Sequence, residues 1–379
     1  MFKMTGYKLV LAAAVLVLCG ASSGFDSEDS ERWLVLPRLL KSAKLEVLWD
    51  NELPIKKGEN LKKLFILGER VYALSDRNYL ISLDREKGQI LFSKTVAAGA
   101  AVDELRLYAD ELMFTLGSTL VEIDVKNGTE RKARRIEFGI KCPAARNSEY
   151  FYISGVDKRL HVLNAEDGVE VFEAAAENNS MITSIAAGED FVVFGTDAGN
   201  VISMAPNRRP IRLWQFDAGD GIVGQIVRNG TSLFFASKDM QVYRVDAVGR
   251  TNRRLVWKYQ MSGVLERAPI VADNAVYQYA RGKGLTAIDR EKGRAIWSLA
   301  DGVDLLAEAA GKAYVITKDR KLVVMDNATG KKLYSVNFAR VSLYAVNATD
   351  SRIYIGDENG RVACLRPAQD SGQATVAGR

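Results

Sequence analysis

The sequence predicts an all-β fold, because three features recur along its 379 residues. Short segments with alternating apolar residues, such as Val276–Ala280 and Leu285–Asp289, are separated by glycine-rich turns, which is typical of antiparallel strands joined by hairpins. An Asp or Asn at a strand end is followed four residues later by Gly, as at Asp84–Gly88 and Asp289–Gly293. This Asp/Asn–Gly anchor returns every 37 to 43 residues.

The period of the anchor predicts the number of repeated units. A period of roughly 40 residues without helical patterning is typical of the four-stranded blades of a β-propeller. Degenerate anchors occur where the period requires them, at Ala205 and Asp246, and an eighth position falls at Arg366. We therefore predict an eight-bladed β-propeller of four-stranded antiparallel blades. The complete anchors are Asp84–Gly88, Asp124–Gly128, Asn164–Gly168, Asp289–Gly293 and Asp326–Gly330.

An aromatic residue follows most anchors by eight to eleven residues, in the outermost predicted strand of the blade. Such a ring can pack flat between neighbouring blades and bury a large apolar area. Blade two has Ile136 and Phe138 instead, and the last blade lacks a strand after Arg366. We expect Leu45–Leu53 to supply that strand, which would close the ring without an exposed sheet edge. The predicted blade-packing aromatics are Trp49, Phe92, Phe172, Trp214, Trp257, Trp297 and Tyr334.

Residues 1–23 have the features of a secretory signal peptide: two lysines, a short apolar run and then small residues. Two processing schemes stay open. Leu16–Cys19 resembles a lipobox, which would lipidate Cys19, whereas the alternative is cleavage after Ser23. Either scheme predicts an exported protein that is periplasmic or associated with the outer membrane.

The remaining boundaries follow from the repeat. The linker contains a short apolar element, Trp33–Pro37, which either docks on the ring or stays a loose leader. We expect a linker over residues 24–43, a β-propeller over residues 44–367 and a disordered tail over residues 368–379.

Catalytic chemistry has little support in the sequence. The single histidine, His161, lies in a strand-like segment, which disfavours His-based triads and His metal sites. Cys142 and Cys364 fall in blades that are not neighbours and lack metal-ligand spacing, so we expect two free, buried thiols. We therefore predict no catalytic, cofactor-binding or metal-binding residues, and no cofactor.

Charge suggests where a partner would bind. The net charge of +5 is mild and does not indicate nucleic acid. Basic residues gather in the outer hairpin turns, where they are either solvated turn charges or a rim for an anionic partner or membrane surface. The densest predicted patch is Arg208, Arg209, Arg253 and Arg254. Inner hairpin turns carry an Asp set, read as turn chemistry or as a cation site: Asp76, Asp157, Asp197, Asp239, Asp319 and Asp357.

The segments Val71–Ser93 and Val276–Ser298 resemble the PQQ-like, quinoprotein-type propeller repeat. With a signal peptide, a linker and eight blades, the chain resembles the BamB-type lipoproteins of the outer-membrane assembly machine. That resemblance implies a non-enzymatic scaffold that binds an envelope protein through loops on one face. We expect the chain to be a monomer. Membrane contact would come through a lipidated Cys19 or the basic rim.

Two alternatives stay open beside the scaffold. One is a PQQ-dependent dehydrogenase of the quinoprotein type, and the other is a propeller that binds a sugar or another small ligand. The enzyme resemblance implies a Ca²⁺ site, a catalytic Asp and often a disulfide between adjacent cysteines. The chain has no adjacent cysteine pair.

Overall fold

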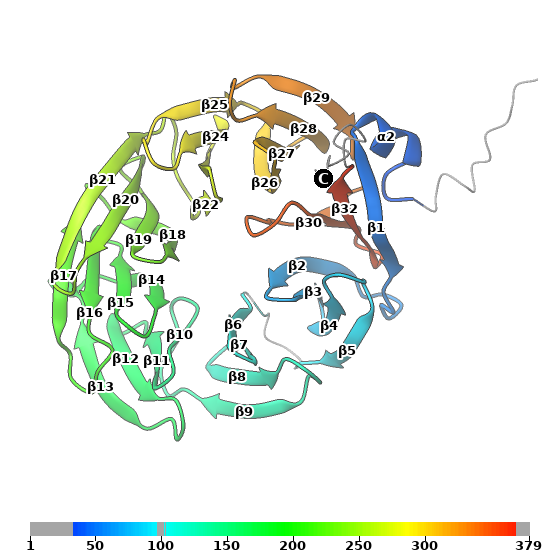
Figure 1. Cartoon of the computed structure of the whole chain (residues 1–379). Helices are drawn as coiled ribbons and strands as arrows, with labels where there is room; N and C mark the ends of the chain where they lie inside the picture. Colours follow the sequence, from blue (N-terminus) through cyan, green and yellow to red (C-terminus); the bar gives the residue numbers. More distant parts are fainter. Residues whose placement is uncertain (1–32, 97–101, 103, 369–379) are drawn as a thin grey trace, which may run out of the picture. The chain divides into compact units, whose positions relative to one another are not determined.

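Four-stranded antiparallel sheets account for nearly all regular structure among the described residues. The computed structural model describes residues 33–96, 102 and 104–368. In this part of the chain the strands form eight sheets of four, arranged as blades around a common axis (Figure 1). The chain divides into units of residues 1–33 and 34–379, and the blades belong to the second. The predicted eight-bladed β-propeller is confirmed.

Blades one to four follow the chain from the innermost strand outwards. Blade one consists of β2 (Leu61–Leu67), β3 (Arg70–Ser75), β4 (Tyr79–Asp84) and β5 (Ile90–Thr95). Blade two consists of β6 (Arg106–Tyr108), β7 (Glu111–Leu116), β8 (Thr119–Asp124) and β9 (Glu130–Arg135). Blade three consists of β10 (Ala145–Arg146), β11 (Tyr150–Ser154), β12 (Arg159–Asn164) and β13 (Glu170–Ala175). After the 3₁₀ turn η1 (Glu177–Asn179), blade four consists of β14 (Ile182–Ala187), β15 (Val192–Thr196), β16 (Asn200–Met204) and β17 (Arg212–Asp217).

Blades five to seven repeat the same order, and blade eight combines both ends of the described chain. Blade five consists of β18 (Ile222–Asn229), β19 (Ser232–Ser237), β20 (Gln241–Val248) and β21 (Asn252–Gln260). Blade six consists of β22 (Ile270–Val271), β23 (Ala275–Ala280), β24 (Gly284–Asp289) and β25 (Ala295–Leu299). Blade seven consists of β26 (Gly302–Ala309), β27 (Lys312–Thr317), β28 (Lys321–Asp326) and β29 (Lys332–Asn337). Blade eight consists of β30 (Leu343–Ala345), β31 (Ile353–Gly356), β32 (Arg361–Pro367) and β1 (Leu45–Glu52).

The anchor residues build the turn between the third and fourth strands of a blade. The Asp84 carboxylate accepts hydrogen bonds from the backbone N–H groups of Glu86 and Lys87, at 2.9 and 2.8 Å. The Gly88 N–H donates to the Asp84 carbonyl at 2.9 Å, with Gly88 at a φ of +70°. Asp suits such a turn because its side chain satisfies backbone donors, and Gly suits it because a positive φ costs glycine nothing.

The aromatic residues dock one blade onto the anchor turn of the next. The Trp49 indole lies over Gly88 and donates from Nε1 to the Arg85 carbonyl at 3.1 Å. Trp257 repeats this arrangement over Gly293, with a bond of 2.8 Å to the Arg290 carbonyl. Of the seven predicted aromatics, Trp49, Trp214, Trp257 and Trp297 are buried, and Phe92, Phe172 and Tyr334 are half-buried.

Arg134 takes the aromatic position in blade two. Its Cδ lies 3.0 Å from where a Cβ at Gly168 would sit, and its Nη2 donates to the Ala165 carbonyl at 2.7 Å. The residues expected there point elsewhere: Ile136 is buried in the core, and the Phe138 ring stacks on His161. A guanidinium group is flat and carries a donor, so it can replace the indole in both packing and hydrogen bonding.

The N-terminal strand closes the ring. β1 pairs with β32 in antiparallel register, with Trp49 opposite Cys364, so the sheet order of blade eight is β1-β32-β31-β30. This confirms the expected role of Leu45–Leu53. The helix α2 (Pro37–Ser42) precedes β1, and Leu40 is buried beside blades seven and eight. Residues 35–43, which the sequence analysis placed in a linker, therefore pack on the propeller.

Several expectations concern residues outside the described part of the chain. The signal peptide, Cys19, the cleavage position after Ser23 and the tail beyond residue 368 all lie there. Among the described residues, every helix is too short or too polar to cross a membrane.

Candidate partner-binding face

The turns of each blade lie at one of two ends of the ring. The anchor turn is hydrogen-bonded to the turn between the first and second strands: the Arg85 N–H donates to the Glu69 carbonyl at 3.1 Å, and the Ala165 N–H donates to the Glu149 carbonyl at 2.8 Å. Both kinds of turn therefore share an end, which we call the anchor face. The turns between second and third strands lie on the opposite face.

The Asp set of the inner hairpin turns lies on the opposite face. Asp239 accepts hydrogen bonds from the backbone N–H groups of Gln241 and Gly219, both at 2.9 Å. Asp197 accepts one from the Met181 N–H at 2.7 Å. These carboxylates bond the backbone of their own turn or of the strand connection beside it, which is the turn chemistry anticipated from the sequence.

Charges of both signs share the anchor face. Arginines in or just after the anchor turns meet carboxylates of the turns between first and second strands: Arg131 pairs with Asp110 at 2.8 Å, and Arg85 pairs with Asp350 at 2.9 Å. The anchor face is therefore not uniformly basic, because acidic residues line its inner part. These acids are Glu69, Asp110, Glu111, Glu149, Glu189, Asp190, Asp273 and Asp350.

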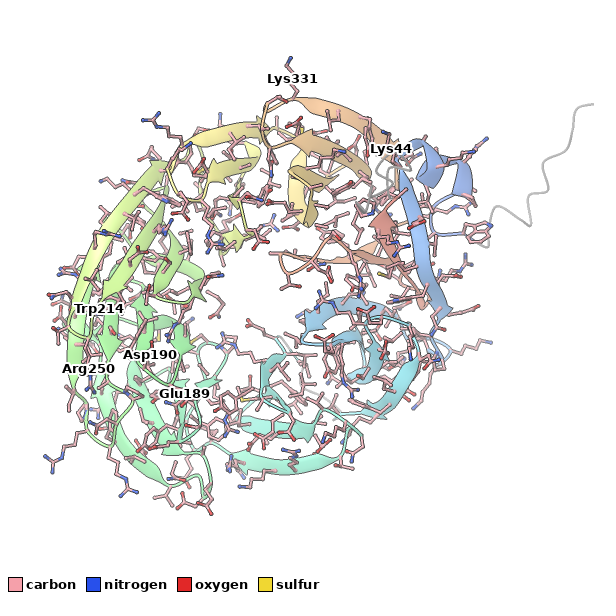
Figure 2. The ribbon with its side chains drawn as sticks, viewed as in Figure 1. Lys44, Glu189, Asp190, Trp214, Arg250 and Lys331 are labelled. Carbon is pink, nitrogen blue, oxygen red and sulfur yellow. The ribbon has the colours of Figure 1, made fainter. Side chains whose placement is uncertain are left out.

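A hollow of about 720 Å³ opens on the anchor face between blades three, four and five. Figure 2 shows Glu189, Asp190 and Arg250, which line it, in the same sector of the ring, with Trp214 nearby. Tyr150, Phe191 and Leu213 supply apolar surface. Polar and apolar atoms contribute about equally to the surface of the hollow, so it can take an occupant that carries both apolar and charged groups.

Two fixed carboxylates form the inner wall of the hollow. Glu189 accepts hydrogen bonds from the Ser148 hydroxyl at 2.6 Å and from the Tyr108 hydroxyl at 2.9 Å. These bonds, led by that from Ser148, hold the pKa of Glu189 below its usual value. Burial opposes ionisation of Asp190, but hydrogen bonds from Arg228 and the Phe191 N–H outweigh it and lower the pKa of Asp190. Both groups are anionic at neutral pH.

The Phe191 ring forms the floor of the hollow, and its contacts with neighbouring side chains hold it in place. The Arg228 guanidinium lies 3.9 Å from the centroid of the Phe191 ring and donates to the Asp190 carboxylate at 2.5 Å. The Phe191 ring also packs against Trp214, with ring centroids 6.3 Å apart. A fixed floor lowers the entropy that binding costs.

The outer wall is basic and is built from the degenerate repeats. Arg208 lies in the turn between β16 and β17, and Arg250 lies at the tip of the hairpin formed by β20 and β21. In that hairpin Asp246 is paired with Arg254 inside the ladder, so it does not form an anchor turn, and the hairpin continues for two more residue pairs. This extension carries Arg250 to the hollow.

The four arginines of the predicted patch lie in different surroundings. Arg208 lines the hollow, whereas Arg254 pairs with Asp246 at 3.2 Å. Arg209 and Arg253 are exposed and do not line it. Sequence reasoning missed Glu189 and Asp190, and it counted Arg250 among the basic residues of the outer hairpin turns but not in the densest patch. The available signal was the loss of the anchor pattern at Ala205 and Asp246.

Comparison with known proteins assigns the chain to a family. The family model described as "Outer membrane protein assembly factor BamB" matches residues 39–139 and 210–364, about two thirds of the sequence. The chain belongs to this family. The BamB-type match leaves out residues 140–209, which supply Glu149, Glu189, Asp190 and Arg208. The hollow is thus built largely from the part of the chain that the family model does not match.

Curated relatives agree with this family at low identity. The chain is 20% identical over 229 residues to the outer membrane protein assembly factor BamB of Yersinia pestis, covering 56% of this chain and 58% of that protein. It is 28% identical over 113 residues to the quinohemoprotein alcohol dehydrogenase of Comamonas testosteroni, covering 25% of this chain and 16% of the enzyme. The matches therefore span less than two thirds of the length of either relative.

Solved structures share the fold of this BamB-type chain. The crystal structure of BamB from Moraxella catarrhalis superposes with a TM-score of 0.64 at 14% identity, covering 85% of this chain and 97% of that one. The computationally designed Ika8 protein also gives a TM-score of 0.64, at 15% identity, covering 83% of this chain and 98% of the design. A designed protein scores as well as a natural one, so this likeness concerns the fold alone.

Proposed function

We propose that the chain is a non-enzymatic scaffold of the cell envelope that binds a protein partner at the anchor face, with the hollow at the centre of the contact. The family match supports a scaffold, and the hollow supplies a rigid site of mixed charge. The outer-membrane assembly role in the names of its relatives is the process in which we expect it to act. In this proposal the propeller is exported, with Cys19 lipidated or the chain cleaved after Ser23.

The composition of the hollow favours an extended polypeptide as its occupant. An aromatic floor between a wall with two carboxylates and a wall with two arginines suits a segment that carries an apolar side chain flanked by charges of both signs. Electrostatic complementarity of this kind contributes more to specificity and association rate than to raw affinity. Arg208, Arg209, Arg253 and Arg254 stay a proposed rim for the more acidic parts of the partner.

The test compares two double variants that remove the same charge from the same face. Arg208→Ser with Arg250→Ser alters the wall of the hollow, and Arg209→Ser with Arg253→Ser alters only the rim beyond it. Partners cross-linked in intact cells are identified by mass spectrometry, and the purified partner is titrated against each variant. We expect the first pair to weaken binding by about tenfold or more and the second by less than about threefold, because exposed charges contribute little.

Two outcomes would overturn the proposal. Equal effects of the two pairs would mean that only net charge matters. Unchanged levels of barrel proteins in the outer membrane of a deletion strain would remove the assembly role.

The dehydrogenase alternative has weaker support. The enzyme match covers a quarter of the chain, and Arg106 of blade two bridges to blades four and five, where it donates to the Gln225 side chain at 2.7 Å and to the Ile185 carbonyl at 3.2 Å. This bridge takes up space near the axis. Titration with pyrroloquinoline quinone and Ca²⁺ tests the alternative, and substrate-dependent dye reduction would establish it.

A further inference from the structure

The only histidine of the chain lies among carboxylates on blade three. His161 is on β12, Asp157 is in the turn between β11 and β12, and Glu173 is directly opposite His161 on β13. Glu170 lies on the same outer strand. This cluster is at the opposite face, so it does not belong to the hollow on the anchor face.

The two ring nitrogens of His161 have different neighbours. Nδ1 lies 3.1 Å from Glu170 Oε1, and Nε2 lies 2.9 Å from Asp157 Oδ2. One ligand atom from each of Asp157, His161 and Glu173 lies within 4.8 Å of the others. When Nδ1–H donates to Glu170, the lone pair of Nε2 faces the Asp157 carboxylate, and Glu173 supplies the third ligand atom of the group. A metal-bound histidine usually has this arrangement, in which a carboxylate fixes the tautomer through the other nitrogen.

The imidazole is held in place by packing. Only 5% of His161 is exposed, and its ring stacks on that of Phe138, with centroids 3.7 Å apart and planes inclined by 20°. Gly155 makes room for the cluster, because a Cβ there would lie 2.1 Å from Asp157 Oδ1 and 3.0 Å from His161 Nε2. The ring is therefore fixed, whereas the exposed Asp157 and Glu173 can adjust.

We propose that Asp157, His161 and Glu173 form a binding site for a divalent transition metal such as Zn²⁺, with Glu170 as the positioning residue. Zinc takes imidazole nitrogen and carboxylate oxygen at about 2.0–2.2 Å, which sets neighbouring ligand atoms about 3.3–3.5 Å apart. The present separations reach those values through small movements of the two carboxylates. Three protein ligands leave a coordination position for water or for a side chain of a partner.

Arg159 opposes the metal in this site. Its guanidinium pairs with Glu173, so a bound cation must displace that ion pair. The competition gives a variant that strengthens binding: Arg159→Gln frees Glu173 and should lower the Kd for Zn²⁺ by several-fold. Loss of an unrelated surface arginine would not have this effect.

A single histidine makes the test direct. The untagged full chain is titrated with ZnSO₄ while the ¹H–¹⁵N correlations of the His161 ring are followed. We expect one equivalent of Zn²⁺ to shift the Nε2 resonance and leave Nδ1 protonated, a readout that does not depend on Cys19. Calorimetry should show that His161→Gln and Gly155→Ala abolish this one-equivalent event, whereas Glu170→Gln weakens it by about 10- to 100-fold.

Asp319→Asn is the matched control, because Asp319 holds the equivalent turn position in blade seven. The control variant should bind Zn²⁺ as the parent does, and circular dichroism establishes that each variant is folded. The proposal is overturned if the ring resonances do not respond to Zn²⁺, or if His161→Gln binds as the parent does. Either result leaves the proposed partner-binding face untouched, since that face lies at the other end of the ring.

Discussion

Trp49 and Gly88 meet at the junction where the ring closes. A Cβ atom at Gly88 would lie 2.5 Å from the Trp49 indole, a distance that carbon atoms do not tolerate. Trp49 belongs to the strand that completes blade eight, and Gly88 belongs to the anchor turn of blade one. The indole ring of Trp49 thus packs blade eight against blade one. This contact is possible only because Gly88 has no side chain.

Gly88→Ala should destabilise the propeller by about 2–4 kcal/mol, because it combines a positive φ with a clash against Trp49. Gly311→Ala is the matched control: its φ is +73°, close to the +70° of Gly88, but no atom lies within 4 Å of its added Cβ. It should cost about 1–2 kcal/mol. Urea unfolding followed by tryptophan fluorescence measures both, and equal losses would show that the contact with Trp49 does not matter.

Arg134→Ala should cost about 2–4 kcal/mol, because it removes the group that docks blade two onto blade three. Arg134 also pairs with Glu122, whose side chain is 3% exposed, so its loss leaves a buried carboxylate with Arg146 alone at 3.3 Å. Arg135→Ala, which changes the exposed neighbour, should cost less than about 0.5 kcal/mol. Thermal unfolding separates the two variants, and a stable Arg134→Ala protein would contradict the docking role.

The stability that the ionised Glu189 side chain contributes should be lost as the pH falls. Its pKa is lowered in the folded protein, chiefly by the Ser148 hydroxyl, so the unfolded chain binds a proton at higher pH than the folded one does. The contribution is therefore complete above the ordinary carboxyl pKa of 4.5 and is lost as the pH falls through the lowered value. Glu189→Gln should be less stable than the parent at pH 7, and the difference should shrink below pH 4.5. A difference that grows in acid would refute the assignment.

The thiols of Cys142 and Cys364 should be inert in the folded protein. Burial raises the pKa of Cys142 to about 11 and that of Cys364 to about 12, so little thiolate forms at pH 8. Peptide mapping after iodoacetamide treatment should find both unmodified until urea unfolds the chain. Rapid alkylation of either peptide in native buffer would show that local opening exposes it.

The architecture could be predicted from the sequence because the residues that define each repeat lie close together in the chain. Asp84 and Gly88 lie in one turn, so their spacing survives in the sequence and predicts a blade wherever it recurs. The repeat also showed that the last blade lacks a strand after Arg366. This gap predicted that Leu45–Leu53 supplies that strand. An arginine in the aromatic position cannot be recognised from the repeat pattern, so the docking role of Arg134 was not predicted.

The candidate sites were harder to predict because they depend on contacts between distant residues. Arg250 reaches the hollow only because the hairpin of blade five continues past Asp246, a matter of register. His161 has Asp157 within four residues, but its pairing with Glu173 depends on how β12 and β13 align. The register between two strands cannot be read from the spacing of residues along the sequence.

Glu46 and Arg366 are hydrogen-bonded partners although 320 positions separate them, and this has a consequence for how the protein is made. Within the described part of the chain, β1 has its partner only once β32 has been synthesised. A product that stops before Arg361 would keep β1 without its neighbour and leave both flanking edges open. Chains that lack β32 would therefore remain recognisable to proteases, and it is the pairing of β1 with β32 that shields these two edges.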